Sequence, residues 1–219
     1  KTCPAMWNEH ESILEEMDLQ GEYQKKNLRT VLTALEVLAS GRELSVSTDS
    51  RVREAIIHTA ERTDFHGRWE KLSDEPYVIC DIGHNEHGLK YNFAQLQQMK
   101  ESGECTDLIM VYGSVADKDV DAVLHLMPEE IVYVFTQAQG KRALAAEDIR
   151  TRYVDFCEQS GRSLSDIYVA GTVVEAVDKA LELALHIKSA DSSAIPMIYI
   201  GGSTYVVSEA VAHMATVRA

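Results

Sequence analysis

The sequence predicts an α/β protein with a six-stranded, mostly parallel sheet and helices on both faces. Beyond residue 67, short apolar runs alternate with stretches of helical spacing, which is the pattern of right-handed β-α-β units. The first two runs, 68–72 and 77–82, are separated only by 73–76. They therefore predict a hairpin that contributes one antiparallel strand. The 219 residues, 45% of them hydrophobic, suffice for one large domain or for one domain plus part of another.

The first third of the chain has a different pattern. Residues 1–20 show little apolar periodicity, whereas helical spacing begins after Gly21 and stops at Ser40–Gly41. A second helix is predicted over 51–61, followed by a linker at 63–67. We therefore predict a mostly helical domain at 1–63 and a sheet domain at 64–219. Because the chain starts at Lys1 and no complete domain precedes residue 20, we expect it to be a fragment of a longer protein.

The sheet domain continues with four more apolar runs, which are predicted strands at 107–112, 131–135, 166–169 and 196–200. Helices are predicted near 88–102, 117–127, 146–160, 173–188 and 205–215. Three strands end in turns that contain glycine, at Gly83, Gly113 and Gly201–Gly202. Glycine lets a backbone turn sharply or approach a ligand, so these turns mark the edge where α/β sheets bind ligands.

Charge and cysteine content exclude several classes of function. The formal net charge of −14 argues against binding to nucleic acid, which depends on basic side chains, and against docking on anionic lipid. No apolar run approaches the length of a membrane span. The four cysteines are far apart and form no metal or disulfide signature, which favours a reducing, cytoplasmic location.

Tyr77–Leu89 carries the main chemical signal. It reads as a strand, a tight turn and the start of a helix, with Asp81 at the strand end and His84 at the turn. A carboxylate there can accept the hydroxyls of a ribose or hold a metal, and an imidazole at a helix N-terminus can meet an anion. The structural alternative is that Asp81 or Asn85 caps the helix. His84 and His87 have zinc-like spacing but no third ligand, so we predict no metal site in this chain.

Other candidates also have a structural alternative. Arg68, in the linker, could bind a phosphate through two hydrogen bonds or be a surface residue. Gln24 and Asn27 lie one helical turn apart and could contact an adenine edge, or could cap the helix and be solvated. Asp117–Asp119 is a charged turn that could bind an anion or cap the next helix. The sequence contains no phosphate-binding P-loop, dinucleotide-binding glycine motif or nucleophile elbow.

Taken in order, these segments resemble a known family. They are Gly21-Glu-Tyr-Gln-x-x-Asn27, Gly67-Arg68, Asp81-x-Gly-His-Asn85, Ala116-Asp-Lys-Asp119, Arg142-Ala143 and Gly202-Ser203. The series resembles the C-terminal half of folylpolyglutamate synthase, including the bifunctional dihydrofolate synthase, in the Mur ligase superfamily. Tyr23 stands where that family usually has histidine, which puts the adenine contacts at this position in doubt.

The resemblance implies a Rossmann-like C-terminal domain preceded by a helical remnant of a P-loop ATPase domain. It implies an ATP-dependent ligase that phosphorylates a carboxylate of dihydropteroate or folate, after which the amino group of L-glutamate attacks the acyl phosphate. Gln24 and Asn27 would contact adenine, Asp81 the ribose, and Arg68 and His84 the phosphates, the last two being the catalytic candidates. Lys118 and Ser203 would lie on the glutamate side.

By the same resemblance, the P-loop and the Mg²⁺ ligands would precede residue 1. We therefore expect the fragment alone to be inactive and the whole protein to be a monomeric ligase. Two alternatives stay open. One is a cell-wall Mur-type ligase that uses a peptidoglycan precursor. The other is a non-catalytic α/β module that binds a nucleotide or a partner.

Overall fold

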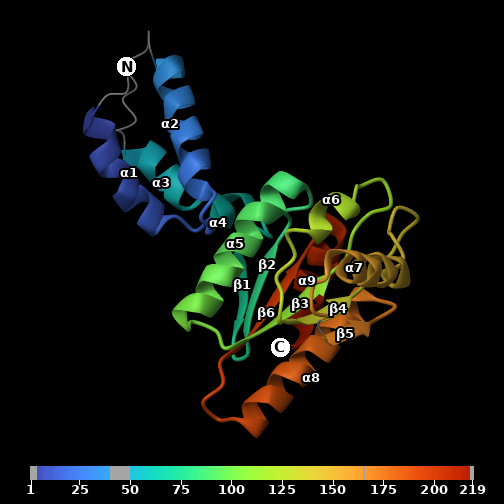
Figure 1. Cartoon of the computed structure of the whole chain (residues 1–219). Helices are drawn as coiled ribbons and strands as arrows, with labels where there is room; N and C mark the ends of the chain where they lie inside the picture. Colours follow the sequence, from blue (N-terminus) through green and yellow to red (C-terminus); the bar gives the residue numbers. More distant parts are fainter. Residues whose placement is uncertain (1–3, 40–49, 165, 218–219) are drawn as a thin grey trace. The chain divides into compact units, whose positions relative to one another are not determined.

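The computed structural model describes residues 4–39, 50–164 and 166–217. The chain divides into two compact units, residues 1–68 and residues 69–219, which we call the helical unit and the sheet unit (Figure 1). Each unit has its own hydrophobic core. Among the residues described, no helix combines the length and the apolar character that a membrane span requires.

In the described residues 4–39 and 50–68, the helical unit contains four helices, α1 (Pro4–Glu16), α2 (Gln24–Ala39), α3 (Ser50–Ile57) and α4 (Thr59–Thr63). Its core consists of six buried apolar residues, Ile13, Met17, Leu28, Leu32, Ile56 and Ile57. Helix α1 was not predicted from the sequence. The predicted helix at 51–61 is interrupted at His58 and becomes α3 and α4. The predicted stop of α2 at Ser40–Gly41 lies outside the described residues.

The sheet unit contains six strands, as predicted. They are β1 (Glu70–Asp74), β2 (Tyr77–Asp81), β3 (Asp107–Tyr112), β4 (Val132–Phe135), β5 (Asp166–Val169) and β6 (Pro196–Gly201). The strand order is β1-β2-β6-β3-β4-β5. Strands β1 and β2 form the predicted antiparallel hairpin, and the other pairs are parallel. Strand β1 starts two residues later than predicted, because Trp69 has a left-handed backbone conformation (φ 51°) that a strand does not accommodate.

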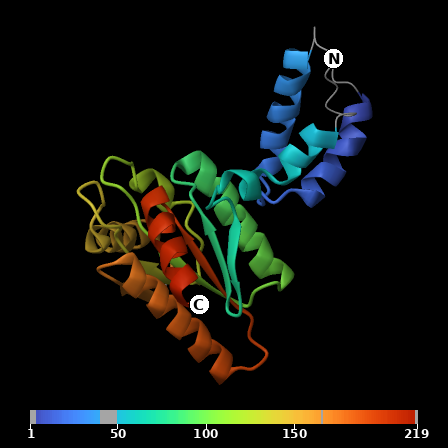
Figure 2. The same cartoon turned by 180° about the vertical axis from the view of Figure 1, so that it is seen from behind.

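Helices cover both faces of the sheet, which confirms the predicted fold class. Successive residues of a strand point to opposite faces of the sheet. On one face, Ile79 and Tyr199 pack with three helices, α5 (Glu86–Ser102), α6 (Asp121–Leu124) and α7 (Ala146–Ser160). Val78 and Ile200 pack with α8 (Val173–Ala190) and α9 (Thr204–Val217) on the other face. Figure 2 shows the face with α8 and α9. The four inner strands, β2, β6, β3 and β4, therefore consist of almost continuous apolar runs, as expected where both faces of a sheet are covered.

Helix α6 is much shorter than the helix predicted over 117–127. Only Asp121–Leu124 is α-helical. Around it, backbone hydrogen bonds span three residues instead of four, as between Val123 N and Val120 O (2.9 Å) and between Met127 N and Leu124 O (3.2 Å). These are 3₁₀-type turns. They bury Val120, Val123, Leu124 and Met127 without a long helix.

Strand register places the ends of four strands at one edge of the sheet. Asp81 pairs with Gly201, Gly201 with Tyr112, and Tyr112 with Phe135. The loops that follow these residues therefore start side by side. This carboxyl edge is where an open α/β sheet binds its ligands.

Candidate functional site

The carboxyl edge of the sheet carries buried polar residues. Asp81 ends β2, Ser114 follows β3, Thr136 follows β4 and Ser203 follows β6, and each is at most 4% exposed. Buried polar groups are costly unless hydrogen bonds satisfy them. Because four such residues lie at one edge of the sheet, this edge is the candidate site. The hydrogen bonds described below show which of these residues have structural partners.

Asp81 is the centre of a buried hydrogen-bond network. Its Oδ1 accepts from the backbone N of Gly83 (2.7 Å) and from Nδ2 of Asn92 on α5 (2.7 Å), and its Oδ2 accepts from the backbone N of Trp69 (2.9 Å). Asn92 Nδ2 also donates to the Tyr199 hydroxyl on β6 (3.0 Å). The carboxylate thus ties together the start of the sheet unit, the turn after β2, a helix and the central strand.

The capping alternative applies to Asn85. Its side chain accepts from the backbone N of Gly88 (2.8 Å) at the start of α5, whereas Asp81 closes the turn before it. Asn92 has a buried carbonyl oxygen, Oδ1, with no hydrogen-bond partner in the described part of the chain. The predicted contact between Asp81 and a ribose stays a prediction, and in this structure the carboxylate bonds to the protein itself.

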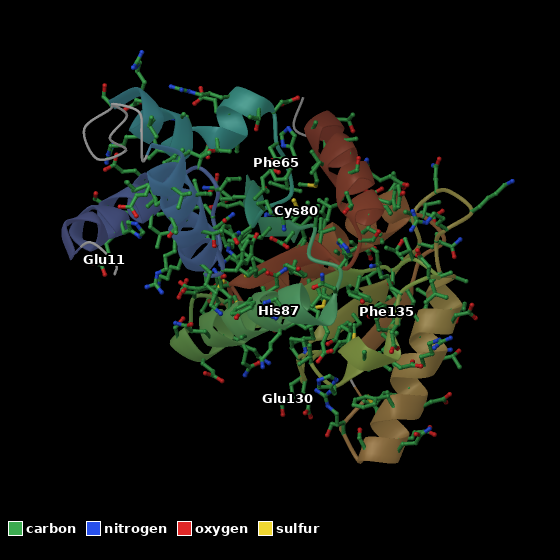
Figure 3. The ribbon with its side chains drawn as sticks, turned by 90° about the horizontal axis from the view of Figure 1, so that it is seen from above. Glu11, Phe65, Cys80, His87, Glu130 and Phe135 are labelled. Carbon is green, nitrogen blue, oxygen red and sulfur yellow. The ribbon has the colours of Figure 1, made fainter. Side chains whose placement is uncertain are left out.

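His84 lies at the same turn and is exposed. Its Nδ1 is 3.0 Å from the carbonyl oxygen of Ile82, so Nδ1 carries the proton that this hydrogen bond requires. The other ring nitrogen, Nε2, is then the one that can interact with a ligand. His87, on the first turn of α5, instead packs edge-to-face against Tyr91 with ring centroids 5.3 Å apart (Figure 3). The two histidines therefore have different surroundings.

The glycines of this edge accommodate neighbouring protein atoms. A Cβ added to Gly113 would lie 2.6 Å from the carbonyl oxygen of Thr136, and one added to Gly202 would lie 2.5 Å from the carbonyl oxygen of Gly113. Gly202 also has a positive φ of 90°, which favours glycine. The sequence offered two reasons for these glycines, a sharp turn and close approach to a ligand. The structure shows the sharp turn at Gly202, together with close packing against the protein's own backbone at Gly113 and Gly202.

Lys118 is exposed in the loop between β3 and α6. Next to it, Asp117 forms an ion pair with Arg142 (2.6 Å), and Asp119 Oδ1 accepts from the backbone N of Ala122 (3.2 Å) at the start of α6. The charged turn therefore bonds to the first turn of α6, although the N-cap position itself is Val120, and it also pairs with a basic residue from another loop. Ser203 is buried, and its Oγ accepts from the backbone N of Tyr205 (3.2 Å) at the start of α9.

The helical unit holds the other predicted site residues. Gln24 is buried and its Oε1 accepts from Asn27 Nδ2 (2.9 Å), which confirms that the two amides share one side of α2. Asn27 is exposed. The Arg68 guanidinium lies over the Phe65 ring, 5.9 Å from its centroid, so the start of the sheet unit is preceded by a cation stacked on an aromatic ring.

Electrostatics distinguish the exposed groups from the buried ones. The hydrogen bond from Arg142 holds the pKa of Asp117 below its ordinary value, and the same bond raises the pKa of Arg142. Burial raises the pKa of the Cys80 thiol on β2, which argues against a nucleophilic role. Burial also raises the pKa of Tyr112 to about 12. Figure 3 labels Cys80 and Phe135, both fully buried in strands.

Metal ligands do not gather in the described part of the chain. Within residues 4–39, 50–164 and 166–217, no group of three or more histidine, cysteine, aspartate or glutamate side chains could hold a metal ion. Sequence reasoning assigned no role to Asn92, Tyr199 or Thr136. Asn92 and Tyr199 are 107 residues apart in the sequence, and neither belongs to a recognisable motif. Only the fold brings Asn92 into contact with Asp81 and Tyr199 into contact with Asn92.

Comparison with known proteins places this geometry in a family. The profile of the Mur ligase glutamate ligase domain matches residues 67–191. The chain is 26% identical over 200 residues to a probable bifunctional folylpolyglutamate synthase/dihydropteroate synthase of Haloferax volcanii, which is 91% of this chain and 21% of that protein. It is 27% identical over 124 residues to the dihydrofolate synthase/folylpolyglutamate synthase of Escherichia coli, which is 56% of this chain and 26% of that protein.

A solved structure shares the fold. The Mycobacterium tuberculosis folylpolyglutamate synthase, crystallised with ADP and AMPPCP, superposes with a TM-score of 0.70 at 26% identity and covers 91% of this chain. The chain spans 41% of that protein, so these relatives are considerably longer. The resemblance that the ordered motifs predicted is confirmed. The chain belongs to the Mur ligase family, and residues 67–191 form its glutamate ligase domain.

Proposed function

We propose that the chain is the C-terminal part of an ATP-dependent ligase that adds L-glutamate to dihydropteroate, to folates or to both, through an acyl phosphate. The observation that carries the proposal is the match of residues 67–191 to the glutamate ligase domain. Relatives named for folate ligation support the substrate class. The ADP and AMPPCP in the M. tuberculosis enzyme support ATP as the phosphoryl donor.

Each predicted site residue receives a role in this proposal. Gln24 and Asn27 contact adenine, and Asp81 contacts the ribose from the strand end where it anchors the turn. His84 and Arg68 contact the phosphates, where a charged or hydrogen-bonding group offsets the charge of the transferring phosphoryl group. For His84, Nε2 is the atom involved, because Nδ1 already donates to Ile82 O. To donate to a phosphate oxygen, Nε2 must itself carry a proton. Lys118 and Ser203 lie toward glutamate.

The P-loop and the Mg²⁺ ligands are proposed to lie in a part of the ligase outside these 219 residues. When bound, Mg²⁺ supplies charge neutralisation at the phosphates of ATP. We expect the 219-residue chain by itself to have no ligase or ATPase activity, and the full-length ligase to act as a cytoplasmic monomer.

The test measures ADP release by the full-length ligase with dihydropteroate or a folate, with and without L-glutamate, and with a UDP-linked cell-wall precursor in place of the folate. Glutamate-dependent turnover on the pterin substrates is expected. The substitution Arg68→Ala should depress kcat strongly without unfolding the protein, whereas Arg150→Ala, which removes an exposed arginine of α7, should not. Turnover only with the cell-wall precursor, or with neither, would contradict the proposal.

A further inference from the structure

A pocket of about 180 Å³ lies at the carboxyl edge of the sheet, on the side of β4 and α9. The β4–α7 loop provides most of its lining, including Lys141 and Arg142, and Val115 and Tyr205 complete it from the loop after β3 and the first turn of α9. None of the predicted site residues lines this pocket. Lys118 is nevertheless three residues from Val115, and Ser203 is two residues from Tyr205.

The walls of the pocket are tied together by hydrogen bonds. Val115 and Ala143 form an isolated antiparallel bridge, and Ala116 N donates to Arg142 O (2.8 Å). On the opposite side, Gln139 N donates to Glu209 Oε1 on α9 (2.7 Å). The loops that follow β3 and β4 are therefore held against each other and against α9, which fixes where the basic side chains of the pocket start.

The pocket is basic in a protein that is acidic as a whole. The formal net charge of the chain is −14, yet Lys141 and Arg142 are adjacent here. Arg142 Nη2 pairs with Asp117 (2.6 Å), which uses one part of a guanidinium that carries five N–H donors. Lys141 forms no hydrogen bond or ion pair within the residues that the structure describes. Tyr205, 48% exposed, adds a hydroxyl next to the N-terminus of α9, where the helix dipole favours an anion.

We propose that this pocket binds the side-chain carboxylate of the amino acid that the ligase adds, with Arg142 as the residue that selects glutamate. The proposal rests on the proposed function. Arginine binds a carboxylate through two parallel hydrogen bonds, and the volume suits a short acidic side chain. With Lys118 and Ser203 on neighbouring loops toward the amino group and the α-carboxylate, the pocket receives the distal end of the same molecule.

The selectivity follows from the chemistry of the pocket. Glutamine has the size of glutamate but presents a neutral amide, which offers one acceptor and two donors in place of two charged acceptors. Facing Arg142 and Lys141, its amide NH₂ meets only donors. A site built to bind a charged group discriminates strongly against an analogue that leaves its donors unpaired.

The test measures steady-state kinetics of the full-length ligase and of Arg142→Gln, with L-glutamate and L-glutamine as competing amino-acid substrates. The KM for L-glutamate should rise about 10- to 100-fold in the variant, while the KM for ATP stays within about twofold. The ratio of kcat/KM for glutamate over glutamine should fall by a similar factor. Arg142→Lys should retain part of the preference, because it keeps the charge and loses the fork of donors.

The matched control is Arg152→Gln. Arg152 on α7 also pairs with an aspartate, Asp121 (2.9 Å), and is similarly exposed, but it does not line the pocket. An unchanged glutamate KM in Arg142→Gln, or an equal loss for glutamate and glutamine, overturns the assignment of the pocket even when the wild-type ligase is active. An inactive wild-type ligase instead contradicts the proposed function, so the two failures are distinguishable.

Discussion

The substitution Asp81→Asn should lower the free energy of unfolding of the sheet unit by about 3–5 kcal/mol. Asp81 Oδ1 accepts two hydrogen bonds, from Gly83 N and Asn92 Nδ2, and Oδ2 accepts one from Trp69 N. An asparagine side chain has an NH₂ donor in place of one carboxylate oxygen. This NH₂ group costs less stability at the position of Oδ2, which accepts one hydrogen bond, than at the position of Oδ1, which accepts two. Trp69 N then loses its acceptor in a buried site, which costs about 1–3 kcal/mol, and each remaining bond loses about 1 kcal/mol because its acceptor is no longer charged.

Urea denaturation followed by tryptophan fluorescence measures this loss. The chain has two tryptophans, so a Trp7→Phe background leaves Trp69, which is buried 6.0 Å from the Tyr199 ring, as the reporter of the sheet unit. The control is Asp121→Asn, which removes an exposed ion pair with Arg152 and should cost no more than about 1 kcal/mol. A loss below about 1 kcal/mol for Asp81→Asn would refute the view that the carboxylate anchors the turn.

Three further substitutions test the same edge of the sheet. Asn92→Leu should change stability by less than about 1 kcal/mol in urea denaturation, because the lost bonds to Asp81 and to the Tyr199 hydroxyl are offset by removal of Oδ1, which is buried with no partner among the described residues; a loss above about 3 kcal/mol would contradict this. Thr136→Val should raise the urea midpoint and increase the free energy of unfolding by about 0.5–2 kcal/mol, since Thr136 Oγ1 is buried with no hydrogen-bond partner in the described part of the chain. A lowered midpoint would show that the hydroxyl is hydrogen-bonded in solution. Arg142 holds the pKa of Asp117 below the ordinary aspartate value of 3.8. In Arg142→Gln, this pKa should rise toward 3.8 in a ¹³C NMR titration. An unchanged pKa would mean that the ion pair does not form in solution.

The fold could be predicted because its signals are local. Strands with continuous apolar runs, such as 107–112 and 196–200, separated by helical spacing, lead directly to a parallel sheet. Helix α1 was missed because its described part buries little, with Ile13 its only fully buried residue, so no apolar period is visible. The helix predicted at 117–127 was too long because the pairs Val120–Val123 and Leu124–Met127 are each three residues apart, a spacing that fits 3₁₀ turns as well as a helix.

The candidate site was only partly visible in the sequence. Asp81, His84 and Asn85 could be proposed because they follow a strand within a few residues. The partners of Asp81 could not, because Asn92 lies on α5, Tyr199 lies on β6 and Trp69 contributes its backbone instead of its side chain. Arg142 was recognised only as part of an ordered motif, and the antiparallel bridge from Val115 to Ala143 that places it near Asp117 depends on two loops meeting in space.

The position of β6 has a consequence for how the chain folds during synthesis. This strand is the last of the six in sequence, but it pairs with β2 on one side and with β3 on the other. Until Pro196–Gly201 leaves the ribosome, the β1-β2 hairpin and the β3-β4-β5 group have no strand to join them. Both groups then expose unpaired edges, which are templates for aggregation. Nascent chains stalled before residue 196 should therefore depend on chaperones, and chains released after synthesis should not.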